Sequence, residues 1–316
     1  MRRRDELSFS FKSGLIALRP GELRLTWQVA GAMSLDGVPG MAGRAGRGPL
    51  ARTLGYLGGA RDPGDEIWAV SVVRDEADVI AYTVEHLLAE GVDRVLVADN
   101  GSVDGTGDLL RRLGRDLPVT VVDDGLAAHH QGVKVTRLAR AAARAGAGWV
   151  IPFDADELWY SPDGRTLADA LRSATCDIAV TDMWNHLPDA ASDVADEPNP
   201  YLRMPQRTSE PLGVVKVAFR AHPWARVVPG NHNVRRPGAR ARLLGIRQVP
   251  FRSAEQIERK HRNGLEALEA GGIAADVGTH WRELGVLPSD EMVARVYDDA
   301  SATETTLDPA PFHSLT

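Results

Sequence analysis

The chain has 316 residues, of which 43% are hydrophobic and 25% charged, and its formal net charge at pH 7 is −6. This composition excludes a wholly disordered chain and suits one large α/β domain with appendages. The acidic balance gives no reason to expect nucleic-acid binding, and the single cysteine, Cys176, excludes an intrachain disulfide framework and a cysteine-based zinc site.

The first 65 residues predict a strand followed by a linker. Residues 22–30 alternate apolar and polar side chains like a half-buried strand, and the glycine-rich residues 37–59 favour a flexible connection or an ordered flap. No segment approaches the ~20 apolar residues that span a bilayer. The basic residues 1–4 lack the apolar run of a signal peptide, so we expect a cytoplasmic protein without an integral membrane segment.

From residue 67 the chain alternates apolar strands with amphipathic helices. The expected strands are 67–73, 95–98, 119–122 and 149–153, and the expected helices are 80–90, 106–113 and 132–144. This alternation predicts an α/β fold with a doubly wound, mostly parallel, Rossmann-like sheet. Such sheets bind ligands beyond the carboxyl ends of their strands, where Asp75, Asp99 and Asp154 stand.

The second half of the chain is less regular. We expect a helix over 166–173, strands over 177–183, 214–219 and 226–228, and a polar loop over 185–205. Ser253 to Gln256 has the pattern of a capping box and predicts a helix that begins there. About the last 16 residues are expected to be loosely ordered.

Asp154-Ala155-Asp156-Glu157 follows directly on the apolar run 149–153. The two aspartates flank a small residue, so both carboxylates can face one cavity. Oxygen ligands select hard cations such as Mg2+ or Mn2+ and leave positions for water and phosphate oxygens. An acidic surface turn would have the same sequence, so the context decides between the two readings.

Three further segments offer ligands at strand or helix ends. In the loop 99–106, Asp99, Asn100, Ser102 and Asp104 can meet polar base or ribose edges, or the loop is an ordinary βα turn with a helix cap. After the first strand, Arg74 can meet phosphate and Asp75 a nucleoside, with Glu76 beside them. Gln131 and Lys134 at a helix start can face an anion, and His232 on a tight turn can bind a metal.

Taken in order, these segments resemble the GT-A fold of inverting glycosyltransferases, closest to family 2. The matching pieces are 70–78, Glu85-His86, 97–102 with 104–106, 149–159, 230–232, and 250–253 with Gln256, Lys260 and Gly264. The resemblance covers about residues 67 to 270. It departs at Asp75, where relatives often have Asn, and at Gln248, where they often have His.

The resemblance implies transfer of a hexosyl or N-acetylhexosaminyl group from a nucleotide diphosphate sugar, with inversion. Asp75 and Asp99 would contact the nucleoside, while Asp154, Ala155 and Asp156 would hold Mn2+ or Mg2+ and the diphosphate. A general base would deprotonate the acceptor. We place Asp182 first for that role, with Glu210 and His186 behind it. Uridine diphosphate sugars are the favoured donors.

The basic stretch 235–262, which includes Arg252 and Lys260, can face an anionic acceptor, an acidic carrier protein or the donor diphosphate, or it is a solvated surface. We expect a small-molecule or carrier-tethered acceptor. Of the 37 basic residues only four are lysines, Lys12, Lys134, Lys216 and Lys260, and we attach no function to this skew.

Two other functions fit parts of the pattern. A nucleotidyltransferase also combines a doubly wound sheet with a carboxylate-bound metal, and a nucleotide-sugar-binding protein without activity would need the same pocket. We divide the chain into a strand segment and linker (1–65), a nucleotide-sugar-binding half (66–160), an acceptor-side half of the same domain (161–270), and a helix with a tail (271–316).

Overall fold

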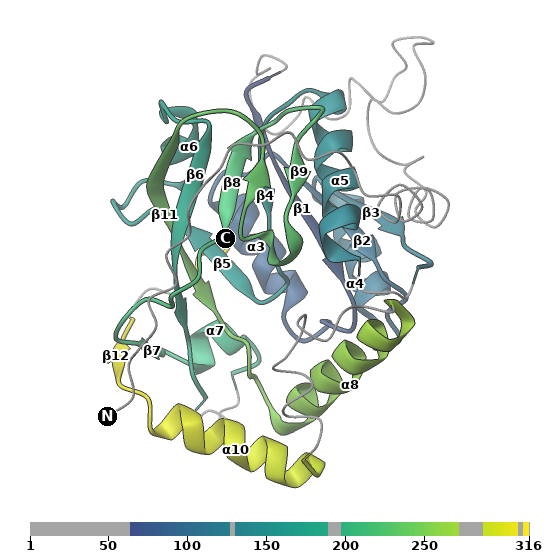
Figure 1. Ribbon diagram of the computed structural model, residues 1–316, viewed down its shortest axis with the longest axis vertical. Helices are drawn as coiled ribbons and strands as arrows, with labels where there is room; N and C mark the ends of the chain where they lie inside the picture. The colour runs from purple at the N-terminus through teal and green to yellow at the C-terminus, as the bar shows by residue number, and fades with distance from the viewer. Residues whose placement is uncertain (1–63, 127–129, 189–196, 272–286, 309–311, 316) are drawn as a thin grey trace, which may run out of the picture.

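The computed structural model describes residues 64–126, 130–188, 197–271, 287–308 and 312–315 (Figure 1). One eight-stranded sheet forms its centre, in the order β3-β2-β1-β4-β8-β6-β11-β5. Its strands are β1 (Glu66–Val73), β2 (Arg94–Asp99), β3 (Val119–Asp123), β4 (Ala147–Pro152), β5 (Glu157–Tyr160), β6 (Ile178–Asn185), β8 (Val217–Arg220) and β11 (Arg240–Gln248). Only β8 and β5 run against the others in this sheet, so the expected mostly parallel α/β sheet of the GT-A type is confirmed.

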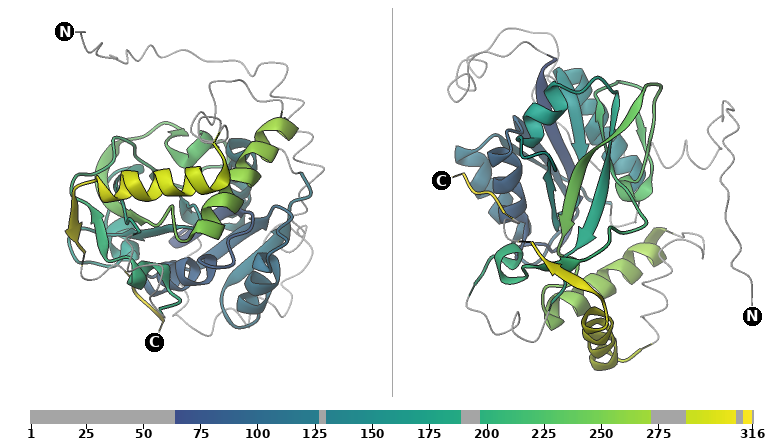
Figure 2. Two further views of the ribbon diagram at one scale, coloured as in Figure 1. Left: turned by 90° about the horizontal axis from the view of Figure 1, so that it is seen from below. Right: turned by 90° about the vertical axis from the view of Figure 1, so that its left-hand side faces the viewer.

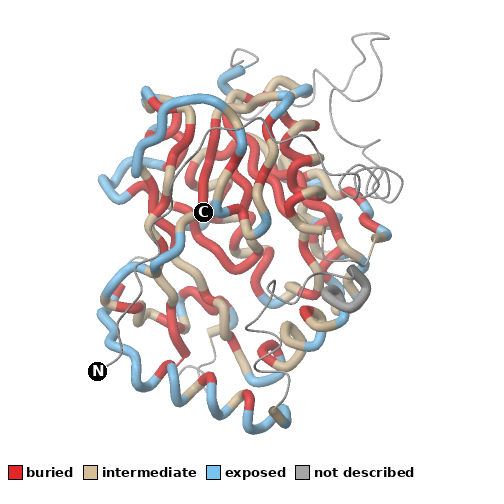
Figure 3. The backbone as a smooth tube through the Cα atoms, in the orientation of Figure 1, coloured by how far each residue is buried: buried red, intermediate tan, exposed pale blue. Residues whose placement is uncertain are grey.

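Helices cover both faces of the sheet. The helices are α3 (Ile80–Ala89), α4 (Thr106–Asp116), α5 (Gln131–Ala145), α6 (Leu167–Arg172), α7 (Pro200–Arg203), α8 (Ala254–Gly271) and α10 (Ser289–Ser301). Buried side chains of α3, α4 and α6 share one apolar cluster, whereas those of α5 belong to a second cluster on the other face. Figure 3 shows the buried backbone concentrated in the central strands and most of α10 exposed.

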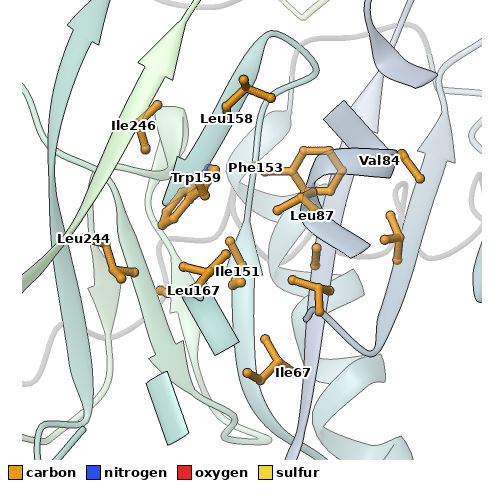
Figure 4. Packing of buried hydrophobic residues seen from close by; sticks show 14 of the residues in the cluster. Ile67, Val84, Leu87, Ile151, Phe153, Leu158, Trp159, Leu167, Leu244 and Ile246 are labelled. Atoms are coloured by element: carbon orange, nitrogen blue, oxygen red, sulfur yellow. The ribbon is translucent and has the colours of Figure 1, made fainter. Parts of the chain in front are cut away.

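The larger cluster fixes α3 against the sheet behind the Asp-Ala-Asp loop. Val84 and Leu87 of α3 pack with Ile151 and Phe153 at the end of β4 (Figure 4). Each is at most 1% exposed, and full burial of such a side chain contributes about 1.5–3 kcal/mol. The loop that follows Phe153 therefore begins from a rigid base.

Two small sheets complete the structure. β7 (Gln206–Thr208) pairs with β12 (Thr305–Leu307), and β9 (Arg226–Val227) pairs with β10 (Val234–Arg235) beside the 3-10 turn η1 (Pro229–Asn231). The expectation that about the last 16 residues are loosely ordered is therefore wrong for 305–307, which gain the hydrogen bonds of a strand. Figure 1 shows β12 beside β7 at one end of α10.

Most of the strands and helices predicted from the sequence are present in the structure. The strands and helices expected between 67 and 153 are all present, with bounds shifted by at most a few residues. The sequence reading missed β5 and β11, and it placed α7 in a loop. The expected strand 22–30 and the linker 37–59 lie outside the described residues. Among the helices that the structure describes, none combines the length and apolar character of a membrane span.

Candidate active site

A cavity of about 340 Å³ opens beyond the carboxyl ends of β1 and β4. Its wall includes many of the residues predicted from the sequence: Arg74, Asp75, Glu76, Asn100, Gln131, Lys134, Asp154, Ala155, Asp156 and Lys260. The first strand, the start of α5 and the Asp-Ala-Asp loop thus meet at one place, as expected for a parallel sheet. Helix α8, which is distant in sequence from these strands, forms another wall of the cavity, and Figure 1 shows it beyond the strand ends.

A second cavity, of about 480 Å³, lies on the other side of the loop 99–106 and is lined by Asp99, Ser102 and Asp123, among others. The Asp99 carboxylate accepts a hydrogen bond from the Ser102 backbone N–H at 3.0 Å. A Cβ at Gly107 would lie 2.1 Å from the second oxygen of Asp99, so any larger residue there would require the Asp99 side chain to move. The two predicted nucleoside ligands, Asp75 and Asp99, therefore face neighbouring cavities.

Side chains of the loop 99–106 hold the end of β1 in place. Ser102 Oγ accepts from the Asp75 backbone N–H (3.0 Å), and the Asp75 carboxylate accepts from the Val103 N–H (2.8 Å). Asp104 accepts from the Ala77 N–H (3.0 Å) and lines neither cavity. Its predicted role as a ligand is thus replaced by a positioning role in the loop.

Asp154 is surrounded by donors from three distant segments. Lys216, directly before β8, forms an ion pair with Asp154 and another with the buried Glu157. The amides of Gln131 and Asn231 donate to the other Asp154 oxygen, each at 3.1 Å. Burial alone would lower the pKa of the Lys216 ammonium, but Asp154 and Glu157 outweigh it and raise that pKa, so Lys216 stays charged.

Asp156 is held in a similar way by α8 and the segment before it. Lys260 donates to one Asp156 oxygen at 2.6 Å, and the guanidinium of Arg252 lies 3.8 Å from the same oxygen. Burial would raise the pKa of Asp156, but these two cations lower it below the usual value, so Asp156 is ionised. Glu157 differs, because burial raises its pKa to about 7 against the opposing charge of Lys216.

Arg252 does not line the cavity but bridges its walls. It is 1% exposed and donates two hydrogen bonds to Asp78, at 2.6 and 3.0 Å, and one to Glu76. The start of α8 is thereby fixed to the end of β1. Half of the expected capping box is present: the Gln256 N–H donates to Ser253 Oγ at 3.2 Å, but the Gln256 side chain accepts from the Arg252 N–H at 3.0 Å and not from that of Ser253.

The donor set at the Asp-Ala-Asp loop fits a hard cation that also binds phosphate. Asp154 and Asp156 offer carboxylate oxygens in one cavity wall, which suits Mg2+ or Mn2+. In the described part of the chain no imidazole or third carboxylate completes a cluster with them. Remaining ligands would have to be water or substrate oxygens, and a cation would compete with Lys216 and Lys260 for the carboxylates.

His232 does not reach this cavity. The turn η1 directs Asn231 inward, where it is fully buried against Asp154, and leaves His232 exposed with its Nδ1 2.9 Å from the Val215 carbonyl oxygen. Asn231 adopts a positive φ of 60°, next to Gly230 at 75°. The structure therefore corrects the predicted His232 ligand, because this turn presents the preceding side chain to the site.

The three candidates for the general base lie outside both cavities. Asp182 lies three residues before the end of β6 and pairs with Arg242 of β11. Glu210 is exposed, and His186 is fully buried with its Nδ1 2.6 Å from the Met204 carbonyl oxygen. The burial of His186 removes it from contact with substrate, while Asp182 stays a prediction.

The lysines mark the site, although their rarity in the sequence was not interpreted as a sign of function. Three of the four lysines in the chain pair with buried or cavity carboxylates: Lys134 with Asp124 (2.6 Å), Lys216 with Asp154, and Lys260 with Asp156 (2.6 Å). In a chain that otherwise uses arginine, the cation at all three positions is the compact ammonium of lysine.

Comparison with known proteins bears on residues 69–221, which match the model of glycosyl transferase family 2. No curated protein matches the chain. Among solved structures, Staphylococcus aureus TarS 1–349 in complex with UDP-GlcNAc aligns at 12% identity over 73% of this chain and 71% of that chain, with a TM-score of 0.39. The UDP complex aligns at 12% identity over 73% and 70%, with a TM-score of 0.36.

A mycobacterial protein aligns at 14% identity over 67% of this chain and 76% of its own, with a TM-score of 0.30. The family match spans β1 to β8 and so contains Asp75, Asp99, the Asp-Ala-Asp loop and Lys216. Residues 69–221, which match the model of glycosyl transferase family 2, therefore supply most of the cavity wall.

Proposed function

We propose that this protein is a metal-dependent, inverting glycosyltransferase that takes a hexosyl or N-acetylhexosaminyl group from a nucleotide diphosphate sugar, with a uridine diphosphate sugar as the first donor to test. One observation carries the proposal. In a family 2 domain, Asp154 and Asp156 share one cavity beyond the carboxyl ends of β1 and β4, with lysines at both carboxylates.

In this proposal the chain supplies binding and charge. Asp154 and Asp156 would hold Mg2+ or Mn2+, and the bound cation would supply positive charge to the departing diphosphate. Lys260, an ammonium at the cavity wall, is placed to donate to a diphosphate oxygen when it leaves Asp156. Asp75, which lines the first cavity, and Asp99, which lines the second, would contact the nucleoside.

The acceptor in this proposal is a small metabolite or a carrier-tethered intermediate, and its attack opposite the diphosphate inverts the anomeric carbon. The basic stretch 235–262 gives little support for a highly anionic acceptor, because many of its charges already have acidic partners. These pairs are Arg236 with Asp177, Arg242 with Asp182, Arg247 with Asp308, Arg252 with Asp78, and Lys260 with Asp156. A cytoplasmic location stays a prediction.

A thermal-shift panel of nucleoside diphosphates and their sugars, each with and without Mn2+ or Mg2+, tests the donor site. We expect one nucleoside diphosphate to raise the Tm, and to do so more strongly with metal, since a ligand at 100 times its Kd stabilises the fold by about 2.7 kcal/mol. Asp156→Asn should remove the metal-dependent part of the shift. Asp290→Asn, an exposed aspartate on α10, is the matched control. Absence of a shift with every nucleoside diphosphate would contradict the proposal.

A further inference from the structure

One face of α3 holds the backbone that follows β4. Thr83 Oγ1 donates to the Ala155 carbonyl at 2.5 Å, inside the Asp-Ala-Asp loop, and His86 Nε2 lies 2.9 Å from the Trp159 carbonyl oxygen. Glu90, the residue after α3, accepts from the Leu167 N–H at 2.7 Å. The three side chains therefore position the whole segment from the loop to the start of α6.

A segment from the other end of the sequence packs on this face. The ring of Phe312 lies 6.0 Å from that of His86 and 6.4 Å from that of Tyr201, centroid to centroid. The His313 backbone N–H donates to His86 Nδ1 at 3.0 Å, and His313 Nδ1 contacts the second oxygen of Glu90. Figure 2 shows this end of the chain beside α3 and α4, away from α8.

His86, Glu90 and His313 bring three donor atoms within 4.8 Å of one another, and among the described residues no other group of three His, Cys, Asp or Glu side chains does so. Hydrogen bonds to the backbone orient the two buried side chains, His86 and Glu90. His86 donates its Nε2 proton to the Trp159 carbonyl, so its Nδ1 lone pair faces His313. One carboxylate oxygen of Glu90 accepts from the Leu167 N–H, and the other faces the cluster. A histidine fixed through its other nitrogen by a carbonyl is the usual outer support of a metal ligand.

We propose that His86, Glu90 and His313 form a binding site for a late first-row divalent cation, with zinc as the ion to test. Two imidazoles and one carboxylate are ligands that zinc accepts at about 2.0–2.2 Å, whereas Mg2+ and Mn2+ prefer oxygen. His313 is 55% exposed, so the fourth position can take water. The site is separate from the cavity of the Asp-Ala-Asp loop and does not depend on the proposed transfer reaction.

Binding would exchange one set of contacts for another. The ion would take the Nδ1 lone pair of His86 from the His313 backbone N–H, and it would stand between the His313 ring and Glu90. If His313 binds through the nitrogen that donates to Glu90, its ring proton moves to the other ring nitrogen, so the ion is bound by the neutral imidazole. The bound ion would clamp the segment 312–315 to the helix that positions the Asp-Ala-Asp loop.

Zinc titration of the untagged full chain tests this site. Excess Mg2+ should be present so that hard-cation sites are filled. We expect one zinc ion per chain, with nitrogen and oxygen ligands at about 2.0–2.2 Å in X-ray absorption. His313→Ala and Glu90→Gln should each weaken zinc binding by at least 10-fold. Glu90→Gln keeps an oxygen for the Leu167 N–H and so separates loss of the ligand from loss of folding.

His222→Ala removes an imidazole elsewhere and should bind zinc as the wild type does. Zinc should also raise the Tm of the wild type and of His222→Ala, but not that of His313→Ala. Absence of stoichiometric zinc binding to the wild type would overturn the proposal. So would unchanged affinity in both His313→Ala and Glu90→Gln.

Discussion

At the scale of single residues, the site depends on how buried charges are balanced. Asp154 and Asp156 each form an ion pair with a lysine, so each carboxylate has a compensating positive charge in a partly buried cavity. Glu157 is fully buried and shares Lys216 with Asp154, so its own charge is poorly compensated. The pKa of Glu157 is therefore raised while that of Asp156 is lowered, although the two acids are neighbours in the sequence.

Glu157 should make stability depend on pH. Burial raises its pKa from 4.5 to about 7, so between these values the folded chain binds a proton that the unfolded chain releases. The free energy of unfolding should then fall as pH rises from 4.5 to 7, and Glu157→Gln should remove that part of the slope. Urea unfolding of both proteins at several pH values, in metal-free buffer, measures the difference. Equal slopes for the two proteins would show that Glu157 titrates normally.

Asp75 shows a second constraint at this scale. Its φ of 56° lies in the left-handed region, which Asp and Asn tolerate better than most residues. This shared tolerance agrees with the Asn that resembling glycosyltransferases often carry at the position. The carboxylate adds acceptors for the Val103 N–H and the Asn263 amide, at 2.8 and 2.7 Å.

At the scale of elements, the sequence predicts those parts whose periodicity is set by burial on known faces. The strands that became β1, β2 and β4 are continuous apolar runs because helices cover both of their faces. β11 escaped prediction because Arg240, Arg242 and Arg247 interrupt its apolar residues and its register shifts between Arg242 and Leu244. β5 is only four residues long and directly follows the acidic loop.

The strand β6 carries the predicted base. Asp182→Asn should lower sugar transfer by a factor of about 10²–10⁴ while nucleotide affinity stays the same, because a general base acts only on the acceptor. Arg242→Gln is the matched control, since it breaks the same ion pair, leaves the carboxylate, and alters a side chain that is 60% exposed. Steady-state rates and nucleotide Kd values for both variants decide the role. Near-normal turnover of Asp182→Asn, or an equal loss in both variants, would remove Asp182 from it.

At the scale of the whole molecule, the site is assembled from distant parts of the chain. Lys216, Asn231 and Lys260 contact the Asp-Ala-Asp loop from 62 to 104 residues away, and no local sequence pattern predicts such contacts. The carboxyl ends of β1, β2 and β4 could be predicted as the site because parallel strands end at one edge. The lysines could have been suspected only from their rarity in an arginine-rich chain.

His232 was predicted as a metal ligand and faces away from the site, whereas Asp154 and Asp156 stay the predicted ligands. Neighbours in sequence can face opposite ways in a tight turn, as Asn231 and His232 do. The two aspartates, in contrast, are separated by one small residue and line the same cavity. The sequence spacing therefore predicted which side chains face the cavity in the Asp-Ala-Asp loop, but not in the turn that holds Asn231 and His232.

The central claim is that the cavity beyond β1 and β4 binds a nucleotide diphosphate sugar with a divalent cation and releases the nucleoside diphosphate. Release of UDP from UDP-sugars, with water or added small acceptors, measures this directly. We predict turnover with Mn2+ or Mg2+ that EDTA abolishes and that Asp156→Asn lowers at least 100-fold, with Asp290→Asn unchanged. Metal-independent release, or equal rates for the wild type and Asp156→Asn, would contradict the account.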